Sequence, residues 1–381
     1  MKEVLHLHIL FAGGGTGGHI NPALAVAGYI KSRRPDTKIS FIGNSSGMEA
    51  KLVPEAGFDF YGIKVAGFQR KINFTNIKRN ISAFYHMFTS SAESSRLLKE
   101  LKPDIVMGTG GYVSGPVLRK AAKMGIRTAI QEQNAFPGVT TKVLSQMVDR
   151  VMLAMPEAEK YLKPKNPVIV TGNPIRDEIL MADKAKSRRA LGLDSRPMIL
   201  SFGGSLGAKR LNETIADVMQ WHYKDAKYYH FHATGKFGIE WMPSLLEKKG
   251  VILKDNPQIH VQEYINNMDT LMSAADLVIC RAGAITLSEL QALGKASILI
   301  PSPNVAENHQ YHNAMALANR GAAAVFEEKD LNSTVIIEKI SEILNNKETL
   351  EKMEKASFSG AILDSNEKIY NVLMDLYRSV H

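Results

Sequence analysis

Three observations predict an α/β protein made of two domains, each built on a parallel sheet. Strand-like apolar runs alternate with helical patterns through both halves of the chain, as they do in βαβ units. A glycine-rich turn follows an early strand in each half, at residues 13–18 and 203–207. The 381 residues, 45% of them hydrophobic, are enough to bury two cores.

In the first half, apolar runs bounded by polar or glycine-containing segments predict the strands. Helical patterns lie between them, for example at residues 23–32 and 114–124. The expected strands are residues 4–12, 38–42, 58–63, 104–107, 128–131 and 168–171.

The second half repeats this scheme and ends in helices from about residue 332. Its expected strands are residues 198–202, 228–232, 258–261, 277–280, 297–300 and 323–326. Residues 172–176, followed by the polar stretch 182–189, form the best linker candidate. We therefore expect domains at 1–175 and 176–381.

Composition narrows the class of protein. The single cysteine, Cys280, ends an apolar run, which favours a buried structural thiol in a reducing cytosol. No apolar stretch reaches the ~18–20 residues of a membrane span, and the first apolar run leads into a glycine turn, so we expect no secretory signal. Residues 1–180 hold 24 Lys/Arg and 14 Asp/Glu, a balance of +10, against −1 for the rest. The basic half indicates an anionic partner surface or a solubility charge with no target.

The two glycine turns indicate binding of a phosphorylated ligand. Glycine lets the backbone approach a ligand closely, and the helix start that follows offers free N–H groups to an anion. The first turn matches G-x-G-x-x-G, but the next strand ends Ile42-Gly43-Asn44 without the carboxylate that holds a dinucleotide ribose. The missing carboxylate disfavours an oxidoreductase. Neither turn ends in Gly-Lys-Ser/Thr, which disfavours a P-loop enzyme.

His19 follows the first turn at the start of the predicted helix. The positive end of a helix disfavours imidazolium, so His19 could be a neutral base, or it could simply bond the loop. Polar residues also follow later strands, at 110–114, 131–134, 281–284 and 307–310, where open α/β sheets bind ligands. Glu289 lies close enough to a helix start to reach a ligand, although a solvated helix carboxylate is the commoner case.

Residues 74–88 form the pattern of a basic amphipathic helix, which is either a membrane-surface helix or an ordinary core-facing one. The basic half of the chain favours contact with an anionic membrane. The expected membrane-contact residues are Phe74, Ile77, Lys78, Arg79, Ile81, Phe84 and Phe88.

Taken together, the motifs resemble the MurG family of N-acetylglucosaminyltransferases. The matching stretches follow one another in order from residue 13 to about 321, so the resemblance covers most of the chain. They are residues 14–19, 110–116, 132–134, 172–176, 203–208, 281–289 and 308–310.

The resemblance implies a GT-B architecture, with the last helix packing back on the first domain. It implies transfer of N-acetylglucosamine from UDP-GlcNAc to the C4 hydroxyl of the muramoyl sugar of lipid I, with inversion, giving lipid II. It also implies a peripheral enzyme on the cytoplasmic face of the bacterial inner membrane. No nucleic-acid partner is expected.

The resemblance also assigns residues. Ser205 and Arg176 would hold the donor diphosphate, the Ile265 backbone the uracil, Glu289 the ribose, and Gln310 and Asn134 the sugar. The acceptor diphosphate would lie against Thr16, Gly17 and Gly18. The substrate-binding set implied by the resemblance is completed by Ala284, Ile285, Thr286, Leu287 and Ser288. Where some family members carry two glutamines, this chain has His309-Gln310, so only Gln310 is assigned.

Inverting transfer needs a base and stabilisation of the departing UDP. His19 is the favoured base, with Glu132 and Tyr112 as alternatives. No Asp-x-Asp triplet or His/Asp cluster suggests a metal, so we expect neither metal nor cofactor. Another GT-B sugar-nucleotide enzyme, either a glycolipid glycosyltransferase or a UDP-GlcNAc 2-epimerase, is the alternative.

Overall fold

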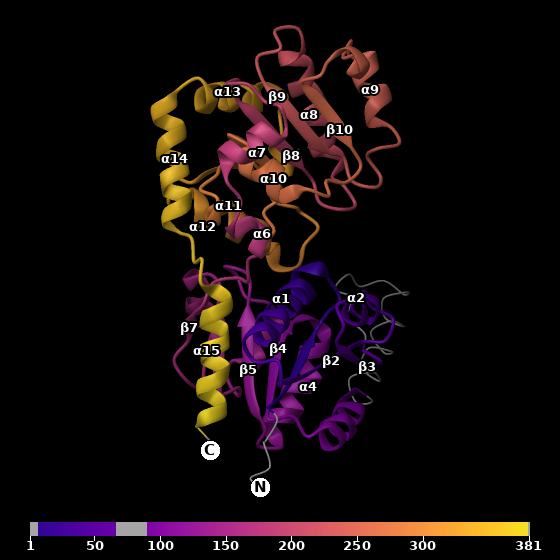
Figure 1. Cartoon of the computed structure of the whole chain (residues 1–381), viewed down its shortest axis with the longest axis vertical. Coiled ribbons are helices and arrows are strands. Elements are labelled where there is room, and N and C mark those ends of the chain that lie inside the picture. The colour runs from indigo at the N-terminus through magenta and orange to yellow at the C-terminus, as the bar shows by residue number, and fades with distance from the viewer. Residues whose placement is uncertain (1–6, 66–89, 380–381) are drawn as a thin grey trace. The chain divides into compact units, whose positions relative to one another are not determined.

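The computed structural model describes residues 7–65 and 90–379 (Figure 1). The chain divides into two compact units. The first unit comprises Met1–Ile175 and Asp364–His381, and the second comprises Arg176–Leu363. The second unit is therefore inserted between two parts of the first.

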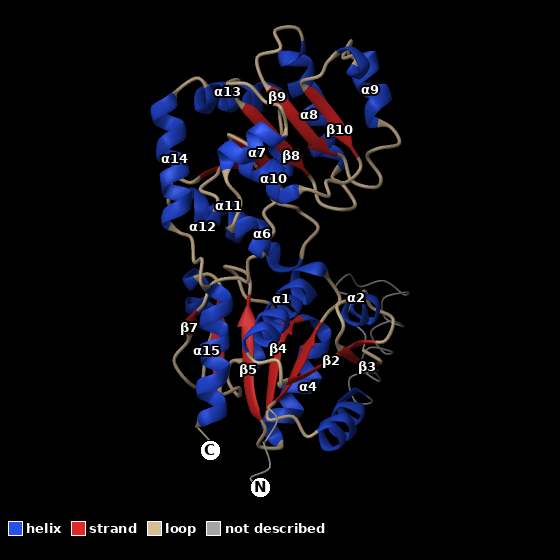
Figure 2. Ribbon diagram, viewed as in Figure 1, coloured by secondary structure: helices blue, strands red, loops and turns tan. Residues whose placement is uncertain are grey.

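The first unit contains a seven-stranded parallel sheet in the order β3-β2-β1-β4-β5-β6-β7 (Figure 2). Its strands are β1 His8–Gly13, β2 Lys38–Asn44, β3 Asp59–Ile63, β4 Ile105–Gly110, β5 Arg127–Glu132, β6 Arg150–Leu153 and β7 Ile169–Val170. Its α-helices with described bounds are α1 Gly17–Arg33, α2 Glu49–Glu55, α4 Gly111–Lys123, α5 Val139–Leu144 and α15 Ser365–Arg378.

The second unit contains a six-stranded parallel sheet in the order β10-β9-β8-β11-β12-β13. Its strands are β8 Met198–Phe202, β9 Tyr229–Ala233, β10 Ile259–Gln262, β11 Leu277–Cys280, β12 Ala296–Leu299 and β13 Ala323–Val325. Its α-helices are α6 Asp177–Leu180, α7 Lys184–Ala190, α8 Lys209–Tyr223, α9 Met242–Lys248, α10 Met268–Ala274, α11 Ala284–Ala292, α12 His309–Ala318, α13 Ser333–Leu344 and α14 Lys347–Ser359.

The predicted α/β class with two parallel sheets is confirmed, and the differences lie in individual elements. Strand β6 is not among the expected strands, and α1 begins at Gly17, two residues before His19, where the helix start was expected. Pro22 lies inside the early part of α1. The predicted amphipathic helix of residues 74–88, with Phe74 through Phe88, lies outside the described residues.

The alternation of side chains along β1 explains the packing of the first unit. Ile9 and Phe11 belong to a core cluster with residues of α1 and α15, whereas Leu10 and Ala12 belong to the cluster that includes residues of α4. Successive strand residues point to opposite faces, so one apolar strand supports a helical layer on each side.

Helix α15 completes the first unit from the far end of the chain. Ile369 and Leu373 are fully buried in the same cluster as Ile20 and Ala23 of α1. The rings of Tyr29 and Tyr370 meet edge to face, with centroids 6.0 Å apart. Figure 1 shows α15, in yellow, among the indigo and magenta elements of the first unit. None of the helices in the described ranges is long and apolar enough to cross a membrane.

Candidate functional site

The first glycine turn is held by a buried carboxylate that the sequence did not single out. Glu49 of α2 accepts hydrogen bonds from the backbone N–H groups of Gly15 (3.0 Å) and Asn44 (2.8 Å). Gly14 has a φ of 149°, which L residues rarely adopt, and a Cβ there would lie 2.2 Å from Glu49 Oε1 and displace the carboxylate. A carboxylate therefore does lie at the end of β2, but it binds the turn itself rather than standing free for a ribose.

His19 lies in the first turns of α1 and is partly exposed. Its Nδ1 is 3.1 Å from Oε1 of Gln133. The Nε2 group of Gln133 donates to the carbonyls of Thr109 (2.9 Å) and Gln131 (3.1 Å), which identifies Oε1 as the acceptor. In the neutral ring, His19 Nδ1 then carries the hydrogen and Nε2 is left as a proton acceptor.

Glu132 and Tyr112 occupy different surroundings. Glu132 is buried, and its carboxylate accepts from the backbone N–H of Asn134 (3.0 Å), the side-chain amide of Asn134 (3.0 Å) and the N–H of Gly138 (3.1 Å). Tyr112, at the start of α4, is 59% exposed. The carboxylate of Glu132 thus stabilises its own loop, and Tyr112 faces solvent.

The second glycine turn forms one wall of a pocket of about 470 Å³. Gly204 and Gly207 have φ values of 89° and 84°, a conformation that favours glycine. The turn leads into α8, and Gly283, the N-cap of α11, lies on another wall, so two helix starts border the space. The remaining lining residues are Phe202, Gly203, Ala208, Lys209, Arg210, Arg281, Thr286, Ser302, Asn304, Gln310 and Glu328.

This pocket contains two of the predicted donor residues, Thr286 and Gln310. The Oε1 atom of Gln310 accepts from the N–H of Ser302 at 2.9 Å, which orients the side chain. Arg281 was not assigned from the sequence. It donates to the carbonyls of Ile300 and Pro301, both at 3.1 Å, and pairs with Glu328.

Arg176 and Glu289 are brought together although 113 residues separate them. Arg176 Nε lies 2.9 Å from Oε1 of Glu289, whose side chain is only 7% exposed. Burial raises the pKa of Glu289, and the hydrogen bond from Arg176 opposes that rise. Glu289 is thus a paired, buried carboxylate and not the solvated one that is common on helices. Neither residue is among those lining the pocket of the second turn.

The other assigned donor residues differ in what they can offer a ligand. Ser205 is exposed within the glycine turn, and the Ile265 side chain is buried. The side chain of Leu287 is fully buried and its N–H donates to the Gly283 carbonyl at 3.0 Å. Ala284 is also buried, whereas Ile285 and Ser288 are partly exposed. Among the assigned residues of α11, Leu287 therefore offers the fewest groups to a bound ligand.

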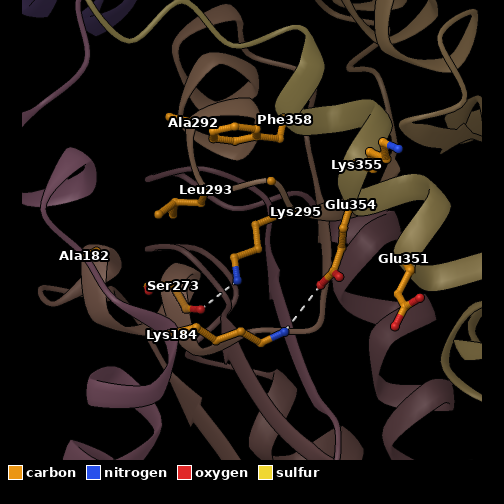
Figure 3. Close-up of a pocket in the computed structure, with 11 residues that line it drawn as sticks. Ala182, Lys184, Ser273, Ala292, Leu293, Lys295, Glu351, Glu354, Lys355 and Phe358 are labelled. Atoms are coloured by element: carbon orange, nitrogen blue, oxygen red, sulfur yellow. Dashed lines mark hydrogen bonds and ion pairs between the residues drawn. The ribbon is translucent and has the colours of Figure 1, made fainter.

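A further pocket of about 500 Å³ lies elsewhere in the second unit and contains none of the predicted site residues (Figure 3). Lys295 lines this pocket and donates to the carbonyls of Ser273 (2.7 Å) and Ala275 (2.9 Å) at the end of α10. Burial, with a contribution from the charge of Lys184, lowers the pKa of Lys295 to about 7. Lys184 itself pairs with Asp276 and Glu354. In the described part of the chain, no cluster of three or more His, Cys, Asp or Glu side chains could hold a metal ion.

Comparison with known proteins gives a consistent result. Residues 9–153 match the glycosyltransferase family 28 N-terminal domain, and residues 198–369 match the family 28 C-terminal domain. The chain is 46% identical, over 374 residues, to a UDP-N-acetylglucosamine–N-acetylmuramyl-(pentapeptide) pyrophosphoryl-undecaprenol N-acetylglucosamine transferase of Acetivibrio thermocellus. That match covers 98% of this chain and 99% of the relative.

Solved structures agree with the sequence matches. The structure of MurG from Acinetobacter baumannii superposes with a TM-score of 0.77 at 29% identity, covering 97% of this chain and 99% of that one. A UDP-GlcNAc 2-epimerase from Neisseria meningitidis superposes with a TM-score of 0.66 at 15% identity, covering 97% of this chain and 100% of that one. The latter similarity concerns the fold alone.

Proposed function

This chain belongs to the N-acetylglucosamine transferases of glycosyltransferase family 28, the MurG family, and we propose that its second unit holds the nucleotide sugar and its first unit the acceptor. The enzyme transfers N-acetylglucosamine from UDP-GlcNAc to the undecaprenyl-linked muramyl acceptor, lipid I. The product, lipid II, is the precursor used in peptidoglycan synthesis.

The observation that carries the assignment of the donor unit is the pocket at the second glycine turn. Two helix starts and the cations Lys209, Arg210 and Arg281 border it, and Arg281 is paired with Glu328, which also lines the pocket. Free N–H groups and positive charge are what a diphosphate requires, both when bound and when it leaves with increased negative charge. Arg176 and Glu289 would add a hydrogen-bonding pair for the ribose and the phosphates of the donor.

His19 is the base in this proposal. Gln133 holds the Nδ1–H of His19, and the Nε2 lone pair is available to take the proton from the acceptor hydroxyl as that oxygen attacks the anomeric carbon. Attack from the face opposite the departing UDP inverts the anomeric centre. Glu132 would support this site by fixing the 134–138 loop rather than by taking the proton.

The test is UDP release from UDP-GlcNAc, measured with and without a lipid I analogue and in the presence of EDTA. Acceptor-dependent release that survives EDTA supports the proposal. His19→Ala should lower kcat while leaving the affinity for UDP-GlcNAc nearly unchanged, whereas His260→Ala, on an outer strand of the second sheet, should leave both unchanged. Release without acceptor would indicate an epimerase or a hydrolase, and failure to bind UDP-GlcNAc would refute the assignment.

We also propose that the enzyme works as a peripheral protein at the cytoplasmic face of the bacterial inner membrane. Its relatives are named for an undecaprenol-linked acceptor, and the +10 balance of residues 1–180 favours an anionic lipid surface. Sedimentation with phosphatidylglycerol vesicles should fall as salt rises. Equal binding to phosphatidylcholine vesicles would contradict the electrostatic part of this proposal.

A further inference from the structure

Five buried polar side chains form a continuous hydrogen-bonded chain through the second unit. They come from two neighbouring strands and one helix: Ser201 of β8, His230 and His232 of β9, and Asn212 and His222 of α8. All five are between 0% and 2% exposed. Ser201 and His232 are partners in the register of β8 and β9, and His230 precedes His232 by two residues, on the same face of the sheet.

The direction of every hydrogen bond in this chain is fixed from one end. The Thr234 carbonyl can only accept, so the amide nitrogen of Asn212 donates to it at 2.8 Å. Asn212 Oδ1 must then accept, and Nε2 of His232, 3.2 Å away, must carry a hydrogen.

The remaining links follow in the same way, because the histidines are neutral. Burial lowers the pKa of His232 to about 3 and that of His222 to about 4, and it lowers the pKa of His230 as well. His232 Nδ1 therefore accepts from the Ser201 hydroxyl at 2.8 Å, and Ser201 Oγ accepts from His230 Nε2 at 2.8 Å.

The chain ends at His222. His230 Nδ1 accepts from Nε2 of His222 at 3.1 Å, and Nδ1 of His222 is buried without a partner among the described residues. All three histidines are thus in the Nε2–H form. The reverse direction would aim Asn212 Oδ1 at the Thr234 carbonyl and place two acceptors 2.8 Å apart, which is repulsive.

The anchored end of the chain lies against the second glycine turn. A Cβ on Gly207 would lie 2.2 Å from the Thr234 carbonyl oxygen. The segment after Thr234 bonds to the turn, because Lys236 N–H donates to the Ser205 carbonyl (3.0 Å) and Phe237 N–H to the Leu206 carbonyl (3.3 Å). A displacement of the Thr234 carbonyl would therefore be transmitted to the turn that lines the pocket.

We propose that His232, His230 and Ser201 are positioning residues that hold the Asn212 amide in one orientation and thereby set the glycine turn to receive a nucleotide diphosphate. This inference rests on the proposed function for the identity of the ligand. The histidines exchange no proton with substrate. They act on the Asn212 side chain, because the hydrogen bond from His232 to Asn212 Oδ1 keeps the amide nitrogen of Asn212 directed at the Thr234 carbonyl.

The test compares UDP binding and kinetics in matched variants. His232→Leu removes the donor to Asn212 and should weaken UDP binding by about tenfold, with a matching rise in the KM for UDP-GlcNAc and a smaller change in kcat. His232→Gln can still donate from its amide nitrogen and should restore most of the affinity. His222→Leu, at the far end of the chain, should destabilise the fold but leave UDP affinity within about twofold, because His222 bonds to His230 and not to Asn212.

Nitrogen-15 chemical shifts of the histidine rings provide a second measurement on the unmodified protein. Protonated Nε2 and unprotonated Nδ1 on all three rings is the expected result, and Nδ1–H on any of them would overturn the proposal even if the variants do not fold. Equal UDP affinity of the wild type and His232→Leu would also overturn it. Absence of UDP binding by the wild type would instead refute the proposed function, so the two failures are distinguishable.

Discussion

Lowering the pH from 7 to 5 should destabilise the second unit by about 4 kcal/mol through two of its buried histidines. The folded-state pKa values of His222 and His232 are about 4 and about 3, whereas an unfolded histidine titrates near 6.5. Because the folded values are depressed, the stabilisation is present above pH 6.5 and is lost as the pH falls toward the folded values. A pH of 5 lies about 1.5 units below the pKa of an unfolded histidine and above both folded values. Protonation at pH 5 therefore stabilises the unfolded chain by about 2 kcal/mol per histidine.

Urea unfolding at pH 7.5, 6 and 5 checks this prediction. Both tryptophans, Trp221 and Trp241, lie in the second unit, so their fluorescence reports its unfolding. Carboxylates titrate as well, and His222→Phe isolates the histidine contribution. The variant should be less stable at pH 7.5 but should lose about 2 kcal/mol less than the wild type between pH 7.5 and 5. Identical losses in the two proteins would refute the assignment of a depressed pKa to His222.

Three further predictions concern single side chains. Glu289→Ala leaves Arg176 without its partner and should raise the KM for UDP-GlcNAc about tenfold with a smaller effect on kcat, measured by steady-state UDP release; a change in kcat alone would contradict a role in donor binding. Gln133→Leu removes the acceptor for His19 Nδ1–H and should lower kcat about tenfold without weakening UDP binding, so an unchanged kcat would argue against His19 as an oriented base. Lys295 has a folded pKa of about 7 against an ordinary 10.5, so the folded state binds fewer protons than the unfolded state between these pH values. The free energy of unfolding should therefore rise by roughly 1 kcal/mol per pH unit from pH 7.5 to 9.5. Urea unfolding of Lys295→Met should show a smaller rise, and equal slopes in the two proteins would rule out a buried neutral amine at Lys295.

The sequence predicted the elements whose signal is local. Apolar runs bounded by turns marked most strands, because a strand buried on both faces is a continuous apolar segment. β6 was missed because it is only four residues long, begins at Arg150 and is closely followed by Pro156. The start of α1 was predicted to within two residues, at His19 instead of Gly17, because the glycine turn marks the change from strand to helix even though Gly17, Gly18 and Pro22 have low helix propensity.

The candidate site was predictable as a set of residues but not as a set of contacts. The resemblance placed Arg176 and Glu289 near the donor, yet nothing in their spacing indicated that they pair with each other. Glu49 carries no motif, and its role appears only when α2 brings it against the first glycine turn. Contacts between residues far apart in sequence depend on packing, which periodicity and turn chemistry do not report.

The membership of α15 in the first unit bears on how the protein is made. A ribosome releases the first sheet early, but the apolar face of α1 and β1 lacks Ile369 and Leu373 until the last residues emerge. The second unit, by contrast, is a single uninterrupted segment, Arg176–Leu363, whose core needs no residue from the rest of the chain. The core of the half that is synthesised first therefore includes residues that are synthesised after the whole of the second unit.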